Sequence, residues 1–311
     1  ISMHFQRKNE IFILNSYLGF FHEILLQLKV NKLFKLNQRY DYKTKSEVNV
    51  VLRNSYNQLK TNSKFIKLIN PILIDSLPKS YLEDYPLIIK FVEKLPWPKK
   101  PRKIFTSVNN FYDDVFKIWC AEKRRIYGTK LIYSQHGGGF QQYLFSDEKE
   151  FLLNTCDEIL VWGKSKDKNK KIKSFLNIKN SPRLFKRPNL KNEAKLNILL
   201  IQDMPRLYTT NIQSSFLHFS EYSKFVKKQS QFINNLDPEK KDKIIVRLGS
   251  VLETFSSNNL YHYEKKIWKK NISQIRTESR NIPIDGSIKN AYVIVITQIC
   301  STVLLECLTS N

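Results

Sequence analysis

The stretch KIFTSVNNFYDDVFKIWCAEKRRIYGTKLIYSQHGGGF, from Lys103 to Phe140, decides the fold. Its first run, Lys103–Val108, is a short apolar segment typical of a buried strand, and Lys130–Gln135 is a second one. Between them, Phe111–Gly128 repeats apolar residues at helical spacing and ends in a glycine, which favours a helix with a glycine cap. A strand, a helix and a second strand predict a parallel βαβ unit.

The same alternation extends outward in both directions from this unit. Residues up to about Leu95 predict a helical N-terminal region, and the proline-broken LPWPKKPRK connects it to the first strand. EILVWG at Glu158–Gly163 predicts a third strand, and the polar, lysine-rich stretch Lys164–Lys195 predicts a linker. Strands are then expected in LNILLIQDMP, KIIVRLG and AYVIVIT, with helices between them. The expected fold is therefore α/β, with two Rossmann-like domains at residues 1–185 and 186–311 that face a cleft.

The composition limits the classes of function. The chain has 311 residues and a formal net charge of +24, which favours anionic partners, yet its lysines are spread along the whole sequence. A solvated lysine surface and a functional basic face both explain that charge. No RRM, KH or zinc-finger signature is present, so we expect no nucleic acid partner.

The cysteines and histidines show no metal-binding pattern. The four cysteines form no CxxC pair, and the five histidines form no HExxH motif, so we expect buried reduced thiols, no metal and no cofactor. The most apolar tract, Val293–Leu308, is too short and too polar to span a bilayer. These features predict a cytoplasmic protein.

The sequence YSQHGGGF places three of the chain's eight glycines at the end of a predicted strand. Ligands of parallel α/β sheets bind at the carboxyl ends of the strands. Gly137, Gly138 and Gly139 permit positive φ and free amide groups for a ligand, and Gln135 lies beside them. His136 exchanges a proton near neutral pH, since its free pKa is about 6.5. A tight turn in which His136 satisfies a buried carbonyl is the alternative.

A second candidate site lies in ITQICSTVLLE, where a buried strand gives way to a helix that begins at Ser301 or Thr302. A hydroxyl cap and the positive end of the helix dipole suit phosphate oxygens. Glu306 follows about one turn later, where a carboxylate either accepts hydrogen bonds from ligand hydroxyls or lies at the surface of an ordinary capped helix.

Other polar residues also follow predicted strands: Asn109 and Asn110, Asp203 and Arg206, and Arg247 within its strand. Arg247 among β-branched residues is expected to be buried or to face the cleft. It either meets a phosphate or carboxylate ligand, or forms a structural ion pair with Asp203, Asp285 or Glu306.

These segments together resemble a bacterial family of transferases associated with surface-carbohydrate biosynthesis, whose members look like GT-B glycosyltransferases. The resemblance spans roughly Ile74–Asn311 and rests on LPKSYLEDY, KIFTSVNNFYDDVFKIWCAE, KLIYSQHGGGF, EILVWG, IIVRLG and STVLLECLTSN. The most specific pieces are SQHGGGF and STVLLECLTSN. The HG turn is also similar to a motif of teichoic-acid glycerophosphotransferases.

The resemblance implies a role for each candidate residue. Ser301, Thr302 and Glu306 hold a nucleotide-sugar donor, and Arg247 neutralises the leaving diphosphate. His136 accepts the proton of the acceptor hydroxyl, with Gln135, Asn109 and the three glycines, Gly137, Gly138 and Gly139, on the substrate. The acceptor is a carbohydrate or a lipid-linked molecule, and the basic surface contacts an anionic inner membrane.

The family continues beyond the last helix, so we expect this chain to be a fragment with an incomplete C-terminal domain. Three alternatives stay open. They are a glycerophosphotransferase or nucleotide-sugar epimerase on the same fold, a basic module that binds anionic polymers, and an inactive scaffold.

Overall fold

The computed structural model describes residues 11–31, 37–56, 61–138, 140, 147–180, 197–203, 219–249, 255–297 and 302–308. By their contacts, the residues form two compact units. The first unit comprises Ile1–His136 and Tyr143–Ser181, and the second comprises Gly137–Gln142 and Pro182–Asn311.

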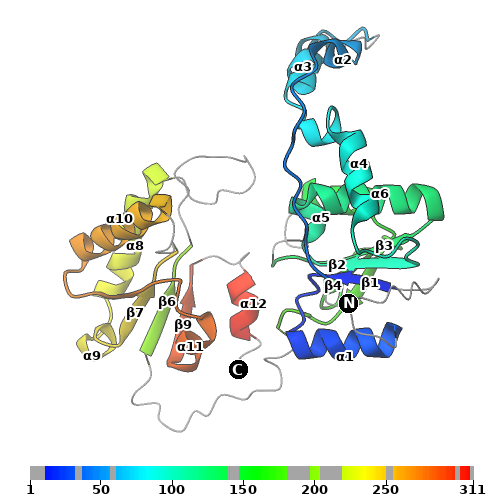
Figure 1. Ribbon diagram of the computed structural model, residues 1–311. Coiled ribbons are helices and arrows are strands. Elements are labelled where there is room, and N and C mark those ends of the chain that lie inside the picture. The colour runs from blue at the N-terminus through cyan, green and yellow to red at the C-terminus, as the bar shows by residue number, and fades with distance from the viewer. Residues whose placement is uncertain are drawn as a thin grey trace. The chain divides into compact units, whose positions relative to one another are not determined.

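The first unit is built on a parallel sheet with the strand order β1-β2-β3-β4-β5 (Figure 1). Its strands are β1 (Ile11–Leu14), β2 (Lys103–Thr106), β3 (Lys130–Ser134), β4 (Glu158–Trp162) and β5 (Ile172–Phe175). The parallel βαβ unit predicted from the opening stretch is confirmed. Two predictions were wrong: β1 lies in the segment expected to be helical, and β5 lies in the expected linker.

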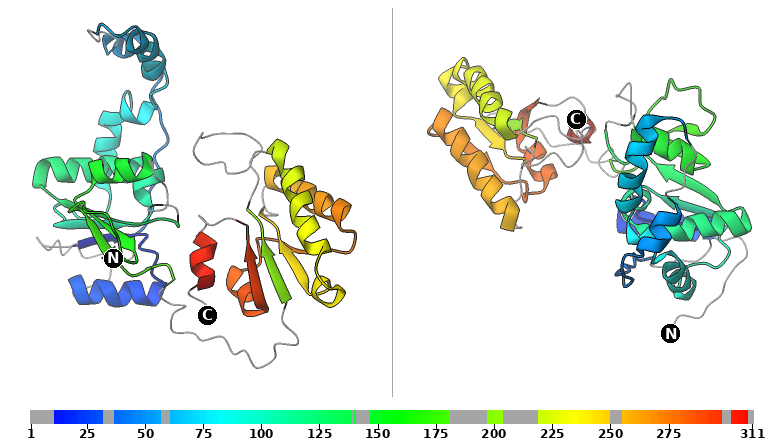
Figure 2. Two further views of the ribbon diagram at one scale, coloured as in Figure 1. Left: turned by 180° about the vertical axis from the view of Figure 1, so that it is seen from behind. Right: turned by 90° about the horizontal axis from the view of Figure 1, so that it is seen from above.

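Two helices, α1 (Phe20–Asn31) and α6 (Asp114–Tyr127), lie on opposite faces of this sheet (Figures 1 and 2). The remaining helical segments are α2 (Val50–Ser55), α3 (Lys64–Asp75), η1 (Lys79–Tyr81), α4 (Tyr85–Lys94), α5 (Asn109–Tyr112) and α7 (Asp147–Thr155). The predicted helix at 111–128 is divided because Asp113 has extended dihedral angles and caps α6, its side chain accepting from the Phe116 amide. Gly128 ends α6 in the left-handed conformation, at φ 64°, as the glycine predicted.

The core of the first unit is aromatic. Phe12 of β1 lies with its ring centroid 4.8 Å from that of Trp119 on α6, and Trp97 of the proline-broken connector lies 4.9 Å from Trp119. All three side chains are buried. Burial of β1 against α6 explains why IFIL is a strand: its apolar side chains fill the sheet face that this helix covers.

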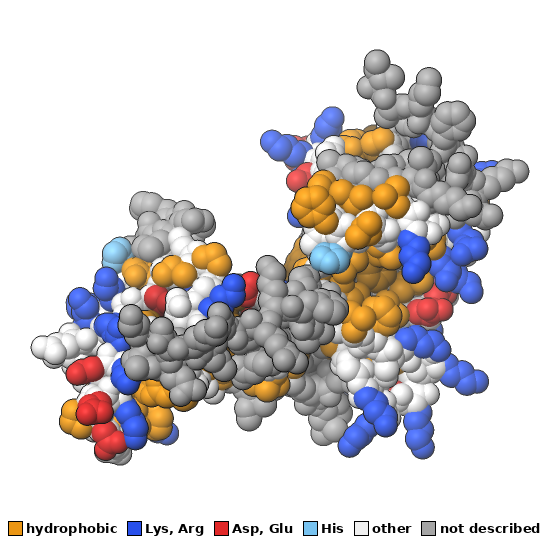
Figure 3. All heavy atoms as spheres, turned by 90° about the horizontal axis from the view of Figure 1, so that it is seen from below, with side chains coloured by type: hydrophobic (Ala, Val, Ile, Leu, Met, Phe, Trp, Pro, Cys, Tyr) orange, Lys and Arg blue, Asp and Glu red, His pale blue; other side chains and the backbone are white. Residues whose placement is uncertain are grey.

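Helix α1 is oriented against the usual pattern. It buries Gln27, while Phe21, Leu25 and Leu28, spaced by helical turns, are exposed. Figure 3 views the chain from the side on which α1 lies, and it shows hydrophobic side chains gathered among Lys and Arg over the first unit.

The second unit has a parallel sheet with the order β8-β7-β6-β9. Its elements are β6 (Asn197–Ile201), α8 (Phe219–Asn234), α9 (Pro238–Lys241), β7 (Ile244–Arg247), α10 (Phe255–Asn271), β8 (Arg276–Glu278), α11 (Ile284–Lys289), β9 (Ala291–Ile296) and α12 (Thr302–Leu308). Leu200 packs with α8 and α10, whereas Leu199 packs with α11 and α12, so helices cover both faces. The chain proceeds from β6 to β7 and β8 and then returns to β9 on the other side of β6. The topological switch point therefore lies between β6 and β9.

Two further expectations concern the cysteines and the membrane. Cys120, Cys156 and Cys307 are buried free thiols, as predicted, and Cys300 lies outside the described residues. Among the helices in the described ranges, none is both long and apolar enough to cross a membrane.

Candidate functional site

The carboxyl ends of β1, β2 and β3 lie side by side and bring residues from three loops together. Tyr17 follows β1, and its hydroxyl forms a hydrogen bond with Nδ1 of His136, which follows β3. Asn15 and Tyr17 have φ values of 51° and 66°, in the left-handed region that non-glycine residues rarely occupy. Such backbone strain persists where the surroundings fix it, and it is common at functional sites.

The imidazole of His136 is half-buried in an aromatic surround. Its ring stacks on Tyr17 at 5.8 Å between centroids, and Phe111 and Tyr112 lie at 5.6 and 6.2 Å. Burial lowers the pKa of His136, the charge of Lys179 lowers it further, and a hydrogen bond with the backbone of Ser107 acts in the opposite direction. The imidazole is therefore neutral at pH 7, which is the form that accepts a proton.

Tyr17 stays protonated at neutral pH. Burial, with smaller effects of Tyr112 and Glu148, raises the pKa of Tyr17 to about 12. A phenol both donates and accepts hydrogen bonds, so the direction of the contact with Nδ1 depends on the tautomer of His136. In the tautomer with the proton on Nδ1, that N–H donates to the Tyr17 oxygen and Nε2 carries the basic lone pair.

Asn109 holds two neighbouring elements in place. Its Oδ1 accepts from Asn15 Nδ2 at 2.6 Å, and its Nδ2 donates to Asp113 Oδ2 at 2.9 Å. The side chain predicted to contact substrate is thus buried and bonded to the loop after β1 and to the cap of α6.

The adjacent Asn110 differs: it is buried, and neither of its amide atoms has a hydrogen-bond partner among the described residues. Buried amides of this kind are commonly satisfied by a water or a ligand.

Gln135 and the glycines have neighbours within the chain. The Gln135 Oε1 accepts from the Trp162 amide at 2.9 Å. The Gly138 amide donates to Thr302 Oγ1 at 3.3 Å, and a Cβ on Gly137 would lie 3.4 Å from the same oxygen, an ordinary contact. Positive φ, which the sequence suggested, does not occur at Gly137, and Gly139 lies outside the described residues.

In the second unit, Arg247 at the end of β7 is buried, and both of its terminal nitrogens donate hydrogen bonds. Its Nη1 donates to Glu278 Oε1 at 2.8 Å and to Ser287 Oγ at 3.0 Å, and its Nη2 donates to the carbonyl of Ile282 at 2.6 Å. Arg247 therefore forms a structural ion pair, which was one of the two alternatives, but the acidic residues predicted as its partners were wrong. Glu278 lies on β8, a strand that the sequence did not predict, and none of the three proposed acids pairs with Arg247 in the described residues.

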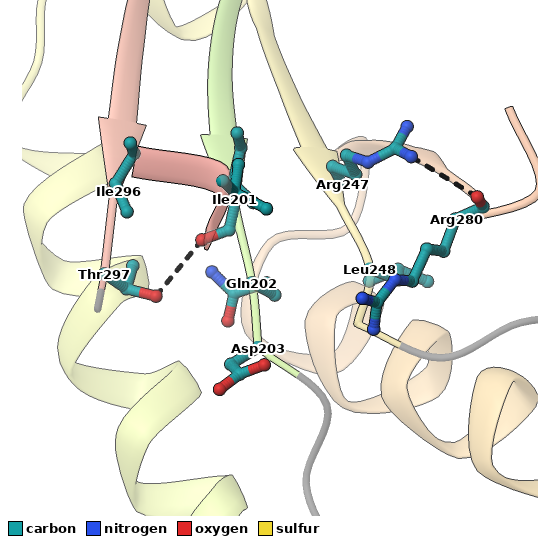
Figure 4. Close-up of a pocket in the computed structure, with 9 residues that line it drawn as sticks. Ile201, Gln202, Asp203, Arg247, Leu248, Arg280, Ile296 and Thr297 are labelled. Carbon is teal, nitrogen blue, oxygen red and sulfur yellow. Dashed lines mark hydrogen bonds between the residues drawn. The ribbon is translucent and has the colours of Figure 1, made fainter. Parts of the chain in front are cut away.

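A pocket opens at the carboxyl ends of β6, β7 and β9 (Figure 4). It is lined by Ile201, Gln202, Asp203, Arg247, Leu248, Arg280, Ile296, Thr297 and Val303. Arg280 is an exposed cation whose Nη1 also donates to the Gly249 carbonyl at 3.2 Å. The Oε1 of Gln202 is buried and has no hydrogen-bond partner in the described part of the chain. The pocket combines the Arg280 cation, the Gln202 amide and the Asp203 carboxylate at the switch point of a parallel sheet, a lining that suits a polar ligand whose anionic group meets Arg280.

Helix α12 begins at Thr302, as predicted, and Ser301 lies outside the described residues. Glu306 is 5% exposed, so the alternative that placed it at the surface was wrong. Arg206, named with Asp203 from the sequence, also lies outside the described residues.

The described residues contain no group of three or more His, Cys, Asp or Glu side chains that could hold a metal ion.

A family model described as LIC12162 family transferase matches residues 1–311. The chain belongs to this transferase family. Comparison with curated proteins and with solved structures gave no match.

Two features of this LIC12162 family transferase escaped the sequence interpretation. Tyr17 was placed in a helix because IFIL runs directly into the helical pattern of α1, although the Asn-Ser pair after IFIL is a turn signal. Arg280 follows the undetected strand β8. Gln202 and Thr297 directly follow β6 and β9 and lie within the predicted strand segments LNILLIQDMP and AYVIVIT, so their position was a usable signal.

Proposed function

We propose that this transferase is a glycosyltransferase that moves a sugar from a nucleotide-sugar donor to an acceptor hydroxyl in surface polysaccharide biosynthesis. The observation that carries the proposal is the His136 site. A neutral imidazole with a lowered pKa lies at the carboxyl edge of a parallel sheet, and Tyr17 contacts its Nδ1. That arrangement suits a general base that acts at neutral pH.

In the proposed reaction, the acceptor oxygen attacks the anomeric carbon of the donor sugar. The proton of the acceptor hydroxyl passes to Nε2 of His136 while Nδ1–H donates to Tyr17. The bond between the anomeric carbon and the phosphate oxygen breaks, and the nucleoside diphosphate leaves with that electron pair. Asn110, whose buried amide has no partner among the described residues, is proposed to bind the acceptor.

The donor is proposed to occupy the pocket of the second unit. Arg280, exposed at its wall, stabilises the negative charge that develops on the leaving diphosphate, while Gln202 bonds to a polar group of the donor. Ser301, Thr302 and Glu306 keep the roles on phosphate and ribose that the resemblance implies. Arg247 orders the pocket wall through its bonds to Glu278 and Ile282 instead of meeting the diphosphate directly.

We further propose a GT-B-type arrangement, in which the two parallel-sheet units face a cleft, at the cytoplasmic face of the inner membrane. The net charge of +24 supports attraction to anionic lipids, where a lipid-linked acceptor resides.

A thermal-shift screen tests the donor assignment. The protein is heated with a panel of nucleotide sugars and with CDP-glycerol, because a ligand that binds the folded state alone raises the midpoint. We expect one nucleotide sugar to raise the midpoint and Arg280→Ala to abolish that rise. Stabilisation by CDP-glycerol alone would indicate a glycerophosphotransferase instead. No stabilisation by any nucleotide, combined with salt-sensitive binding to anionic polymers, would contradict the enzyme and support the binding module.

A further inference from the structure

Residues 48–56 and 61–77, which contain α2 and α3 and which we call the apolar arm, display large hydrophobic side chains to solvent. Val51, Phe65 and Leu68 are 81%, 70% and 67% exposed. The other exposed members are Val48, Val50, Tyr56, Ile66, Ile72, Leu73 and Leu77. Figure 1 shows α2 and α3 at the end of the first unit that is farthest from its sheet. Contiguous exposed apolar surface of this kind marks an interaction site.

The pattern of α3 shows that the exposure is systematic. Phe65, Leu68 and Ile72 repeat at helical spacing, and Ile66, Ile69 and Leu73 extend the same stripe. The opposite side of the helix carries Lys64, Lys67, Asn70 and Asp75, among others. In a globular protein such a stripe faces the core, yet Ile74 is the one buried residue of α3. The stripe is therefore available to a partner.

The arm is firmly held at its base, so the exposure is not that of a loose segment. Arg53 of α2 is buried, and its guanidinium donates to the carbonyls of Ile74, Asp75 and Leu77 at 2.7, 2.8 and 2.9 Å. Its Nε donates to Glu83 Oε1 at 2.7 Å, and this hydrogen bond lowers the pKa of Glu83 to about 2. The last turn of α3 is thus capped by a side chain from α2.

We propose that the apolar arm docks on an anionic lipid bilayer, with the stripe of α3 in the acyl boundary and its lysines at the headgroups. Lys64 and Lys67 are exposed and flank Phe65 and Ile66 in the sequence KFIK. Apolar residues with adjacent lysines are the composition of helices that lie in a membrane interface. The inference rests on the proposed function for the membrane location alone, because docking does not require the transfer reaction.

Charge decides between a bilayer and a second copy of the chain. Two copies that met at their arms would each bring Lys64, Lys67 and a net charge of +24, so like charges would oppose the contact. Anionic headgroups attract the same lysines, at about 1 kcal/mol for each lysine near the surface. The exposed stripe of α1 carries fewer exposed apolar residues than the arm, so the arm is the stronger candidate.

Vesicle flotation tests the proposal without any donor or acceptor. The protein is mixed with vesicles of phosphatidylcholine, either alone or with phosphatidylglycerol. We expect flotation with the mixed vesicles, and a loss of about tenfold or more in the bound fraction for Phe65→Ser/Leu68→Ser. Lys64→Gln/Lys67→Gln should weaken binding to mixed vesicles about fivefold for each lysine, the factor that corresponds to 1 kcal/mol, and leave phosphatidylcholine binding unchanged.

Two controls use exposed apolar residues elsewhere in the chain, and the pair on α1 matches the exposure of Phe65 and Leu68. Phe232→Ser on α8 and Phe21→Ser/Leu25→Ser on α1 should keep flotation within about twofold, and thermal midpoints of all variants should match that of the parent because the side chains are exposed. Two outcomes would overturn the proposal. In the first, the parent chain does not float with the mixed vesicles. In the second, flotation is lost in Phe21→Ser/Leu25→Ser alone. A dimer in light scattering that Phe65→Ser/Leu68→Ser abolishes would assign the arm to a second copy. A transferase inactive in solution that still floats would contradict the proposed function and leave the docking intact.

Discussion

In the first unit, the loop after β3 sets an imidazole against the phenol of the loop after β1, and burial keeps both groups in their neutral forms. In the second unit, β7 ends in a guanidinium that donates to Glu278, Ser287 and two carbonyls. Both sites lie at the carboxyl edge of a parallel sheet. The first retains a group that exchanges a proton near neutral pH, whereas the second uses its buried cation to hold its own loops.

This difference shows that the position of a charged residue at the end of a strand does not decide whether the residue binds a ligand or holds its own loops in place. Arg247 and Arg280 both line the pocket of the second unit, but Arg247 is buried and bonded through both terminal nitrogens, while Arg280 is exposed. Anionic ligands bind to cations that they reach without breaking a buried ion pair. The contrast between the units therefore becomes testable through matched substitutions.

The largest expected effect is that of Arg247→Ala on stability. Removal of the guanidinium leaves Glu278 nearly buried without its counterion and frees two loop carbonyls, which costs on the order of 3 kcal/mol. The free energy of unfolding by urea measures this loss. Arg280→Ala is the matched control, because its side chain is exposed: we expect stability within about 0.5 kcal/mol of the parent and weakened donor binding.

The opposite result would assign donor binding to Arg247 instead of Arg280. If Arg247→Ala keeps its stability and loses donor-induced stabilisation, then the guanidinium of β7 contacts the donor and the role implied by the resemblance holds.

The second effect concerns the proton-accepting group of the first unit. His136→Ala should lower turnover by about 10²-fold with donor affinity unchanged, because the lost group acts on the acceptor hydroxyl. Steady-state kinetics with the donor from the thermal-shift screen measure both quantities. His22→Ala, an exposed histidine on α1, should keep parental turnover. Equal turnover in the two variants would remove His136 from the mechanism.

The third effect tests Tyr17 as a positioning residue. Tyr17→Phe keeps the ring stacked on His136 and removes one hydrogen bond, so turnover should fall about fivefold, which corresponds to about 1 kcal/mol, with KM unchanged. The pH profile gives an independent readout. The imidazole acts as a base when it is neutral, and burial lowers its pKa. Activity should therefore rise with pH through a midpoint below 6.5 and level off above that midpoint.

A midpoint above 6.5 in the parent enzyme would contradict the environment described for His136. A Tyr17→Phe variant with parental turnover would show that the hydroxyl does not orient the imidazole. Nitrogen chemical shifts of His136 distinguish the two tautomers and require no substrate.

The sequence predicted the interior strands of both sheets and one edge strand, β9, but it missed the other three edge strands. β2, β3, β4, β6 and β7 are apolar runs buried between helices, and periodicity detects such strands. The missed strands β1, β5 and β8 are all edge strands, and β5 and β8 read IKSF and RTE. Edge strands have a neighbour on one side only and tolerate polar residues, so their signal is weak.

The candidate site was predictable in part for a related reason. His136 was visible because it follows an interior strand, whereas Tyr17 follows the edge strand β1 and Arg280 follows the edge strand β8. The partner of Arg247 was unpredictable because Glu278 is distant in sequence and reaches it only through the pairing of β7 with β8. Ion-pair partners follow from strand order, which the sequence did not supply.

The smallest expected effect is that of Gly137→Ala. Gly137 is outside the left-handed region, and a Cβ there would meet Thr302 Oγ1 at an ordinary 3.4 Å, so stability should change by less than about 0.5 kcal/mol. Gly128→Ala is the contrasting variant, since φ 64° at the end of α6 should make alanine cost about 1 kcal/mol or more. Urea unfolding measures both. If Gly137→Ala is as stable as the parent but loses turnover, then the missing side chain leaves room for a substrate, as YSQHGGGF suggested. If stability and turnover both stay at parental values, this glycine is dispensable at the site and the sequence interpretation gave it too much weight.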